Sequence, residues 1–257
     1  MKKTFKFYAC RLVVFFIGLF VIIGCGTDDT DSFTSKPEGT FTDPRDGQTY
    51  RWIRIGEQVW MAENLNYASA DSWCYDNNTM HCDHYGRLYT WYAAMNGAPP
   101  SNYSPSGVEG VCPPGWHVPS DNQWHELVNY VDAMGFPNEM FATNGAGNAL
   151  KSCRQVDSPL GGSCNTSTHP RWAYPEVENV DGIYGIDAFG FSALPGGQRC
   201  GYYGSFDFLG EDGGWWTTAE SSSTLALHQS LFIFAGSLIR SPMPKSYGRS
   251  LRCVRNN

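Results

Sequence analysis

The chain has 257 residues, of which 18 are basic and 25 acidic, for a net charge of −7. Removing the four basic residues of the first 24 leaves 14 minus 25, or −11, and a surface this acidic argues against nucleic acid as a partner. The part beyond residue 40 is long enough for one large domain with a hydrophobic core.

An export signal is predicted at residues 1–24. Residues 1–11 carry four basic and no acidic side chains, and Leu12 to Ile23 form an apolar run too short to span a bilayer. The run ends in Val-Ile-Ile-Gly followed by Cys25, which resembles the lipobox of bacterial lipoproteins. This resemblance implies that the Cys25 thiol receives a diacylglycerol group before cleavage. The alternatives are a membrane anchor or an ordinary signal with a chance cysteine.

Residues 25–39 are predicted to form a flexible acidic tether, because they are polar and show no apolar periodicity. Asp28, Asp29 and Asp31 follow closely on Cys25. Such a cluster resembles the surface-export signals of some Bacteroidota lipoproteins. We therefore expect an extracytoplasmic protein that is attached to the outer membrane through its N-terminal lipid and faces the cell surface. Each buried methylene of the lipid contributes about 0.8 kcal/mol to that attachment.

The domain predicted over residues 40–257 opens with a β-hairpin. Thr49 to Ile55 alternates like a strand, Gly56-Glu57 forms a turn, and Gln58 to Met61 is the return strand. An earlier turn is predicted at Asp43 to Gly47, where Asp, Pro and Gly residues cluster.

Two amphipathic helices are predicted after the hairpin. The first lies between Tyr85 and Asn96, and the second begins at Ser120 or Asp121, either of which can cap its first turn. Gly135 stands where a left-handed stop for the second helix is expected. The residues on the two apolar faces are Leu88, Trp91, Tyr92 and Met95 in the first helix, and Trp124, Leu127, Val128 and Val131 in the second.

The second half of the chain is predicted to combine long loops with antiparallel strands. Residues 136–184 are rich in Gly, Pro, Ser and Asn and are expected to be mostly loop, with a segment at 146–151 that could be helical. The segments that alternate like strands are Phe189 to Leu194, Trp215 to Ala219, Leu225 to Phe234 and Ser250 to Val254. The order of hairpin, two helices, loops and strands indicates the α+β class.

Six sequence blocks occur in a fixed order along the domain. They begin at Trp60 (WMAENLNY), Tyr85 (YGRLYTW), Cys112 (CPPGWHVPSDNQW), Gly190 (GFSALPGG), Gly214 (GWWTTAE) and Tyr247 (YGRSLRCV). Together with the hairpin they resemble the Fibrobacter succinogenes major paralogous domain family, over nearly all of the chain past residue 40. The resemblance implies secreted or lipid-anchored bacterial proteins with no established activity. It also implies a C-type lectin-like fold, which the formylglycine-generating enzymes share.

The cysteines predict a disulfide-stapled domain, which suits an oxidising compartment. The predicted pairs are Cys74 with Cys82, Cys153 with Cys164, and Cys112 with Cys253. Cys200 is left over, as a partly buried free thiol or, alternatively, as a reactive thiol or an intermolecular partner. Formylglycine-generating relatives use a redox pair of cysteines, and no paired-cysteine motif is visible in this chain.

Aromatic residues in a glycine-rich segment are the candidate ligand-binding residues. Rings that stack beside polar groups are a common way of binding sugars, and a loop surface formed by Cys200 to Asp212 is expected to present them. The candidates are Tyr202, Tyr203, Phe206 and Trp216. The alternative is that most of these rings pack inside the domain.

An acidic loop supplies the candidate metal ligands. Asp207, Glu211 and Asp212 offer carboxylate oxygens that suit calcium, and the alternative is that they are solvated turn residues. The calcium site of C-type lectins needs an Asn-Asp pair after a tryptophan, and this chain has Thr217 and Thr218 at that place. The departure puts the usual lectin calcium site in doubt, so calcium is the one cofactor considered and no other is expected.

These patterns lead to one functional prediction with two alternatives. The prediction is a lipid-anchored protein of the cell envelope that acts as a non-catalytic binding or adhesion module for a glycan or a protein. No catalytic residues are predicted, because no serine elbow, P-loop or dinucleotide fingerprint occurs. The alternatives are an enzyme of unrecognised type related to the formylglycine-generating fold, and a purely structural envelope protein.

Overall fold

A computed structural model describes residues 38–152, 172–173 and 185–256 of the protein. The predicted export signal, Cys25 and all but the last two residues of the predicted tether lie outside these ranges. The predicted pair of Cys153 and Cys164 also lies outside them.

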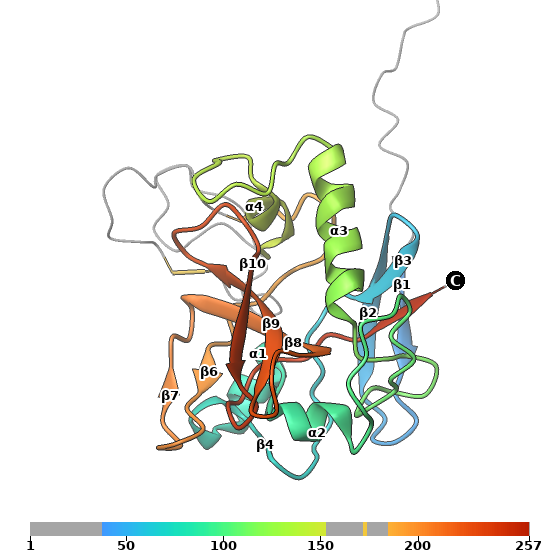
Figure 1. The fold of residues 1–257 in the computed structure, drawn as a ribbon, viewed down its shortest axis with the longest axis vertical. Helices are drawn as coiled ribbons and strands as arrows, with labels where there is room; N and C mark the ends of the chain where they lie inside the picture. Colours follow the sequence, from blue (N-terminus) through green and yellow to red (C-terminus); the bar gives the residue numbers. More distant parts are fainter. Residues whose placement is uncertain (1–37, 153–171, 174–184, 257) are drawn as a thin grey trace, which may run out of the picture. The chain divides into compact units, whose positions relative to one another are not determined.

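Four strands form an antiparallel sheet that brings the two ends of the described chain together. They are β1 (Glu38–Thr42), β2 (Thr49–Ile55), β3 (Gln58–Met61) and β11 (Val254–Asn256), in the order β1-β2-β3-β11. The predicted hairpin is confirmed with its bounds, and Gly56 takes the positive φ that its turn requires. Strand β1 is not indicated by the sequence, because its first two residues belong to the predicted tether. Figure 1 shows β11 returning to the first three strands.

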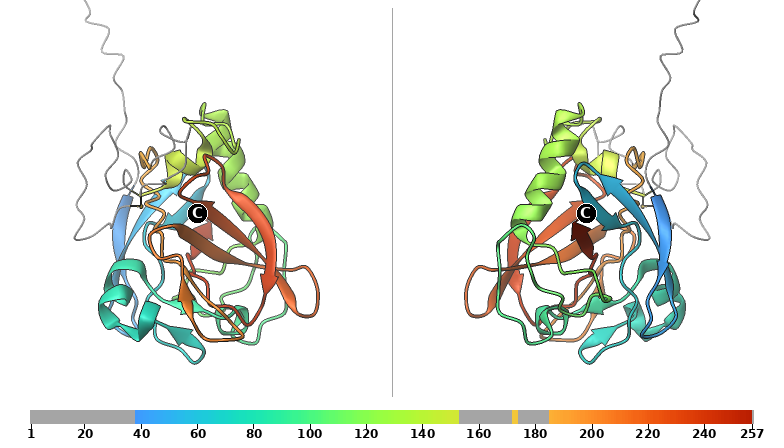
Figure 2. Two further views of the ribbon diagram at one scale, coloured as in Figure 1. Left: turned by 90° about the vertical axis from the view of Figure 1, so that its left-hand side faces the viewer. Right: turned by 90° about the vertical axis from the view of Figure 1, so that its right-hand side faces the viewer.

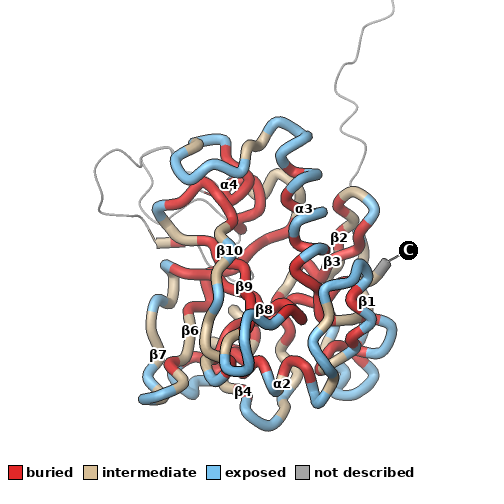
Figure 3. The backbone as a smooth tube through the Cα atoms, in the orientation of Figure 1, coloured by how far each residue is buried: buried red, intermediate tan, exposed pale blue. Residues whose placement is uncertain are grey.

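A second antiparallel sheet lies at the centre of the domain. It contains β8 (Asp212–Glu220), β9 (Leu225–Phe232) and β10 (Ile239–Pro244), in the order β10-β9-β8. Every residue of β8 except Glu220 is buried, and Figure 3 shows similar burial along β9. The sequence does not indicate β10, because Pro242 and Pro244 disfavour a strand. The sheet accommodates them because β10 lies at its edge, where a missing N–H leaves no ladder bond unmade.

Two short ribbons complete the strands of the described chain. In one, β4 (Ser72–Trp73) pairs with β5 (Leu88–Tyr89), and in the other, β6 (Gln198–Arg199) pairs with β7 (Phe206–Asp207). The segment from 189 to 194 is not a strand, contrary to the prediction. Only Ala193 in this segment makes an isolated bridge, which is to Lys151. The alternating pattern arises because Phe191 is buried, with its ring packed against the core tryptophans and not on a sheet.

Helix α3 (Asp121–Ala133) confirms the second predicted helix. The Ser120 hydroxyl accepts a hydrogen bond from the backbone N–H of Gln123, and the Gln123 side chain accepts one from the N–H of Ser120, both at 3.1 Å, which is a capping box. The predicted apolar face of α3 is buried, and the helix packs on β8 and β9. Figure 2 shows the helix beside these strands. None of the helices within the described ranges has the length and apolar character needed to cross a membrane.

The other helices are short. They are η1 (Tyr75–Asn77), α1 (Thr79–Tyr85), α2 (Trp91–Met95) and α4 (Ala146–Leu150). The helix predicted between Tyr85 and Asn96 begins only at Trp91, because Leu88 and Tyr89 pair with β4. Helix α1 is not predicted, since it lacks an apolar face. It is held by the Asn78 side chain, which caps Met80 N–H, and by a disulfide from Cys82.

The core formed by the described residues consists of two clusters that meet at β8. Trp215 faces α3, where its ring lies 5.8 Å from that of Trp124. Trp216 faces the other way, and its indole N–H donates to the carbonyl oxygen of Tyr89 at 2.7 Å. Both tryptophans are 0% exposed. Neighbouring side chains of a strand point to opposite faces, so β8 is buried on both sides.

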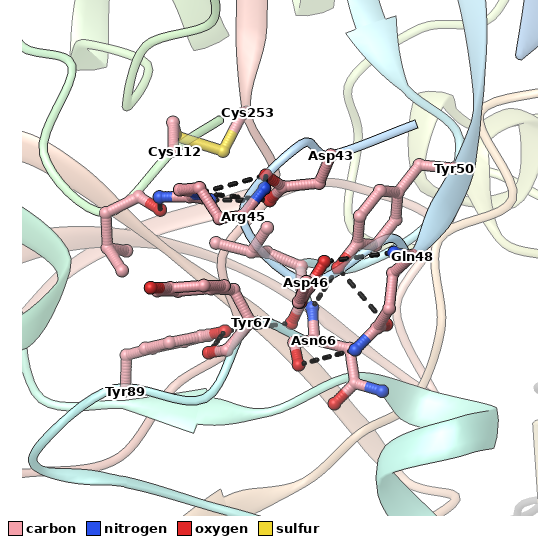
Figure 4. A network of polar contacts seen from close by, with 12 residues as sticks. Asp43, Arg45, Asp46, Gln48, Tyr50, Asn66, Tyr67, Tyr89, Cys112 and Cys253 are labelled. Carbon is pink, nitrogen blue, oxygen red and sulfur yellow. Dashed lines mark hydrogen bonds and ion pairs between the residues drawn. A yellow bond between two sulfur atoms is a disulfide. The ribbon is translucent and has the colours of Figure 1, made fainter. Parts of the chain in front are cut away.

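The disulfides confirm two of the predicted pairs, Cys74 with Cys82 and Cys112 with Cys253. The second links the segment before α3 to the end of the chain, over a sequence separation of 141. Beside it, Arg45 donates to the Asp43 carboxylate at 2.7 Å and to the carbonyl oxygen of Val111 at 3.0 Å, as Figure 4 shows in part. The turn between β1 and β2 is thereby fixed to the same segment. The last strand therefore closes against the start of the central helix.

Candidate functional site

The ribbon of β6 and β7 presents two of the predicted ligand-binding residues to solvent. Its turn is closed by the N–H of Cys200 donating to the carbonyl oxygen of Ser205 at 2.8 Å. Tyr202 and Tyr203 lie in this turn with 74% and 89% of their surface exposed. The ring of Tyr202 meets that of Tyr247 edge-on at 6.1 Å. Tyr203 is thus free on both ring faces, while Tyr202 is held on one side.

The other two predicted aromatic residues behave differently. Phe206 is half-buried, and its ring lies 5.3 Å from that of Tyr75, so it forms part of the ribbon's base. Trp216 is 0% exposed, which corrects the prediction that it contacts a ligand. Trp216 is inaccessible to a ligand because β8 is buried on both faces, and its indole N–H is bonded to the carbonyl oxygen of Tyr89.

The three predicted metal ligands do not converge. The Asp212 carboxylate is buried and bonded to the Arg249 guanidinium, with oxygen–nitrogen distances of 2.6 and 3.0 Å. Asp207 is half-buried next to Ser205, and Glu211 is exposed. Within residues 38–152, 172–173 and 185–256, no group of three or more His, Cys, Asp and Glu side chains is placed to hold a metal ion. The ion pair, which the sequence does not indicate, occupies the oxygens that calcium would need.

A cavity of about 380 Å³ lies beside the ribbon, between the start of β8 and the edge strand β10. Its walls are mostly apolar, and the rings of Phe232 and Phe234 stack in parallel at 5.5 Å, with 10° between their planes. The backbone of Phe208 has φ +65°, an uncommon conformation for a bulky residue, and its side chain is 53% exposed. The other apolar lining residues are Ile233, Pro242 and Met243. This cavity has the size and character of a small-molecule site.

Buried polar groups line the same cavity. The Arg249 side chain is 0% exposed, and it bonds to Asp212, to the Gln198 side chain and to the Ser230 hydroxyl. Its guanidinium lies so close to Gly214 that a Cβ at that position would overlap it. The Nε of Arg249 has no hydrogen-bond partner in the described structure. The ion pair therefore leaves one buried donor unused.

His228 also lines the cavity and is held in its neutral form. Burial lowers the pKa of His228 to about 3, and the positive charge of Arg249 acts in the same direction. Its Nδ1 lies 2.9 Å from the carbonyl oxygen of Ser241. A carbonyl oxygen only accepts, so Nδ1 carries the hydrogen and Nε2 carries a lone pair. Among the described residues, nothing donates to that lone pair.

Residues 53–255 match the family model described as the Fibrobacter succinogenes major domain, which is more than half of the chain. The chain belongs to the Fibrobacter succinogenes major domain family. Neither the search of curated proteins nor the search of solved structures returned a match. The ribbon, the cavity and both disulfides all lie within the matched range of this Fibrobacter succinogenes major domain.

Among the described residues of this Fibrobacter succinogenes major domain, Cys200 is a free and buried thiol, which is the first of the states expected for it. It is buried at the base of the ribbon turn, with Sγ 3.7 Å from the Tyr247 hydroxyl. The backbone N–H groups of Tyr203 and Tyr202 bond to the sulfur and lower the pKa of the thiol. Cys253 is bonded to Cys112, so Cys200 and Cys253 do not form the redox pair that a formylglycine-generating relative would need.

His228 is expected to make the stability of the Fibrobacter succinogenes major domain sensitive to acid. The pKa of about 3 in the folded protein lies below the ordinary histidine value of 6.5, so between these values the unfolded chain binds a proton that the folded chain does not. The resulting destabilisation is absent above pH 6.5, grows as the pH falls and is complete near pH 3. Between pH 7 and pH 4 it amounts to about 3 kcal/mol.

The test is urea unfolding of wild type, His228→Gln and a control, His84→Gln, at pH 7 and pH 4. His84 lies outside the cavity and is half-buried. We expect the loss of stability between the two pH values to shrink by about 3 kcal/mol in His228→Gln alone. An equal loss in all three proteins would show that His228 is not the acid-sensitive group.

Proposed function

We propose that the protein is a lipid-anchored component of the cell envelope whose domain binds a glycan or a protein without catalysing a reaction. The observation that carries this proposal is the exposure of Tyr202 and Tyr203 at the tip of a hydrogen-bonded ribbon. Exposed aromatic rings on a rigid support bind with little loss of conformational entropy, and tyrosine also offers a hydroxyl for hydrogen bonding. The ribbon turn therefore suits the planar face of a sugar ring or an apolar side chain of a partner protein.

The proposed location outside the cytoplasm has separate support. The two disulfides found among the described residues suit an oxidising compartment. The leader of residues 1–24 and the lipobox-like sequence ending in Cys25 provide an export route and a site for the lipid. The acidic stretch after Cys25 supports presentation at the outer surface of the outer membrane.

The finer fold assignment is also part of this proposal. An N-terminal hairpin, the helices that follow it, long loops and a closing antiparallel strand fit a C-type lectin-like arrangement, with β1 and β11 in one sheet. In such an arrangement the loops between the helices and the final strands form the ligand-binding surface. The ribbon of β6 and β7 lies in that part of the chain.

The test measures binding of the secreted domain to a glycan array. Wild type is expected to bind, and the double variant Tyr202→Ser with Tyr203→Ser is expected to lose at least tenfold in signal. Tyr103→Ser is the matched control, because Tyr103 is 80% exposed and does not belong to the ribbon.

The same measurements with and without a calcium chelator address the metal. Binding is expected to persist without calcium, because Asp212 is already paired with Arg249. Absence of binding by wild type to any glycan of the array would reject glycan binding and favour a structural role. Equal loss in Tyr103→Ser and the double variant would reject the ribbon as the site.

A further inference from the structure

The cavity beside the ribbon is lined by residues other than the exposed tyrosines Tyr202 and Tyr203. Its volume of about 380 Å³ falls within the range of small-molecule pockets, which is about 300–1,000 Å³. The stacked pair of Phe232 and Phe234 gives it a flat apolar wall, and Met243 is an adaptable neighbour. A flat apolar group such as a substituted benzene ring matches these walls.

The polar groups in this cavity indicate which functional group an aromatic ligand should have. His228 is 3% exposed, and its Nε2 lone pair meets no donor within the described part of the chain. A ligand with an O–H or N–H group would satisfy it.

The charges in the cavity select against anions. Asp212 balances Arg249 in a direct ion pair, and His228 is neutral near pH 7, so neither leaves a free positive charge. Glu211 is exposed and adds one negative charge to the lining. An anionic ligand would be repelled, and a neutral one would not.

We propose that this cavity is a binding site for a neutral aromatic small molecule bearing a hydroxyl or amino group, with the ring against Phe232 and Phe234 and the donor on His228 Nε2. The site is separate from the ribbon tip and does not require that Tyr202 and Tyr203 bind a glycan. It gives the domain a second ligand of a different chemical class.

The experiment measures binding of phenol, toluene and benzoate to the whole secreted protein by ligand-observed NMR. Phenol and toluene have nearly the same shape, so their comparison isolates the hydroxyl group. We expect phenol to bind about tenfold more tightly than toluene, as one buried hydrogen bond would give. Benzoate is expected to bind more weakly than phenol. Equal binding of phenol and toluene by wild type would overturn the proposal.

Two variants separate the ring site from its acceptor. Met243→Trp fills the cavity from the edge strand, where Met243 is half-buried, and is expected to abolish binding of both phenol and toluene. His228→Leu removes the acceptor and is expected to keep toluene binding, which also reports that the protein is folded, while the tenfold preference for phenol disappears. Phenol binding that survives in Met243→Trp, or a preference that survives in His228→Leu, would reject the site.

A last comparison distinguishes this proposal from glycan binding by the ribbon. The variant Tyr202→Ser with Tyr203→Ser is expected to bind phenol like wild type, because neither residue lines the cavity. Loss of phenol binding in that variant would show that the two sites are not separate. If phenol binds and no glycan does, the proposal that the ribbon binds a glycan is rejected and the proposal for the cavity is supported.

Discussion

Replacing Asp212 with asparagine is expected to lower the free energy of unfolding by about 3 to 5 kcal/mol, because it leaves the Arg249 guanidinium buried without a counter-charge. Arg249 is 0% exposed, and both oxygens of Asp212 accept from it, at 2.6 and 3.0 Å. The Gly214 backbone lies against the guanidinium, so the side chain has no room to turn toward solvent. Urea unfolding followed by tryptophan fluorescence measures the change.

Two further variants identify the cause of that loss. Glu63→Gln alters the partly exposed pair of Glu63 and Arg51, which are 3.8 Å apart, and is expected to cost less than about 1 kcal/mol. The double variant Asp212→Leu with Arg249→Met removes both buried charges and is expected to be more stable than Asp212→Asn. If Asp212→Asn were no worse than Glu63→Gln, the ion pair would not be a main support of the central sheet.

Removing the disulfide between Cys112 and Cys253, by changing both residues to alanine, is expected to cost about 5 kcal/mol. In the chain-entropy model the cost grows with the length of the loop that the bond closes, and here the sequence separation is 141. Removing the bond between Cys74 and Cys82, separated by 8 residues, is expected to cost about 2 to 3 kcal/mol. Denaturant unfolding of both double variants gives the two values.

The comparison between the two bonds is the informative part of this experiment. Both variants lose two sulfur atoms from buried positions, so the packing losses are similar and the difference reports on loop length. A local bond that proves as costly as the long-range one would show that strain or residual structure outweighs chain entropy. In that case β11 would be held mainly by its pairing with β3.

The parts of the fold that were predictable are those determined by neighbouring residues. The hairpin of β2 and β3 follows from alternation around Gly56-Glu57, and α3 follows from its cap at Ser120 and its apolar spacing. Strand β10 was not predictable, because two prolines mark a loop unless the strand is known to lie at an edge. The segment 189–194 alternates because Phe191 enters the core, a contact that depends on distant tryptophans.

The candidate site shows the same division. Tyr202 and Tyr203 are exposed as predicted, since they lie in a tight turn between short strands. Trp216 was misplaced because the sequence does not reveal that β8 is buried on both faces. His228 and Arg249 were missed for a related reason. A histidine in an alternating strand and an arginine near the chain's end both suggest a solvent-facing position, and only the packed structure places them around a cavity.

The sheet that contains both β1 and β11 affects how the protein can be immobilised on a surface for binding measurements. Figure 1 shows β1 and β11 on one side of the domain and the ribbon of β6 and β7 on the other. A sensor chip or bead coupled at β1 or β11 therefore leaves the ribbon turn that carries Tyr202 and Tyr203 on the side away from the support. Any attachment that holds the domain at β1 would likewise leave the ribbon turn accessible to solvent.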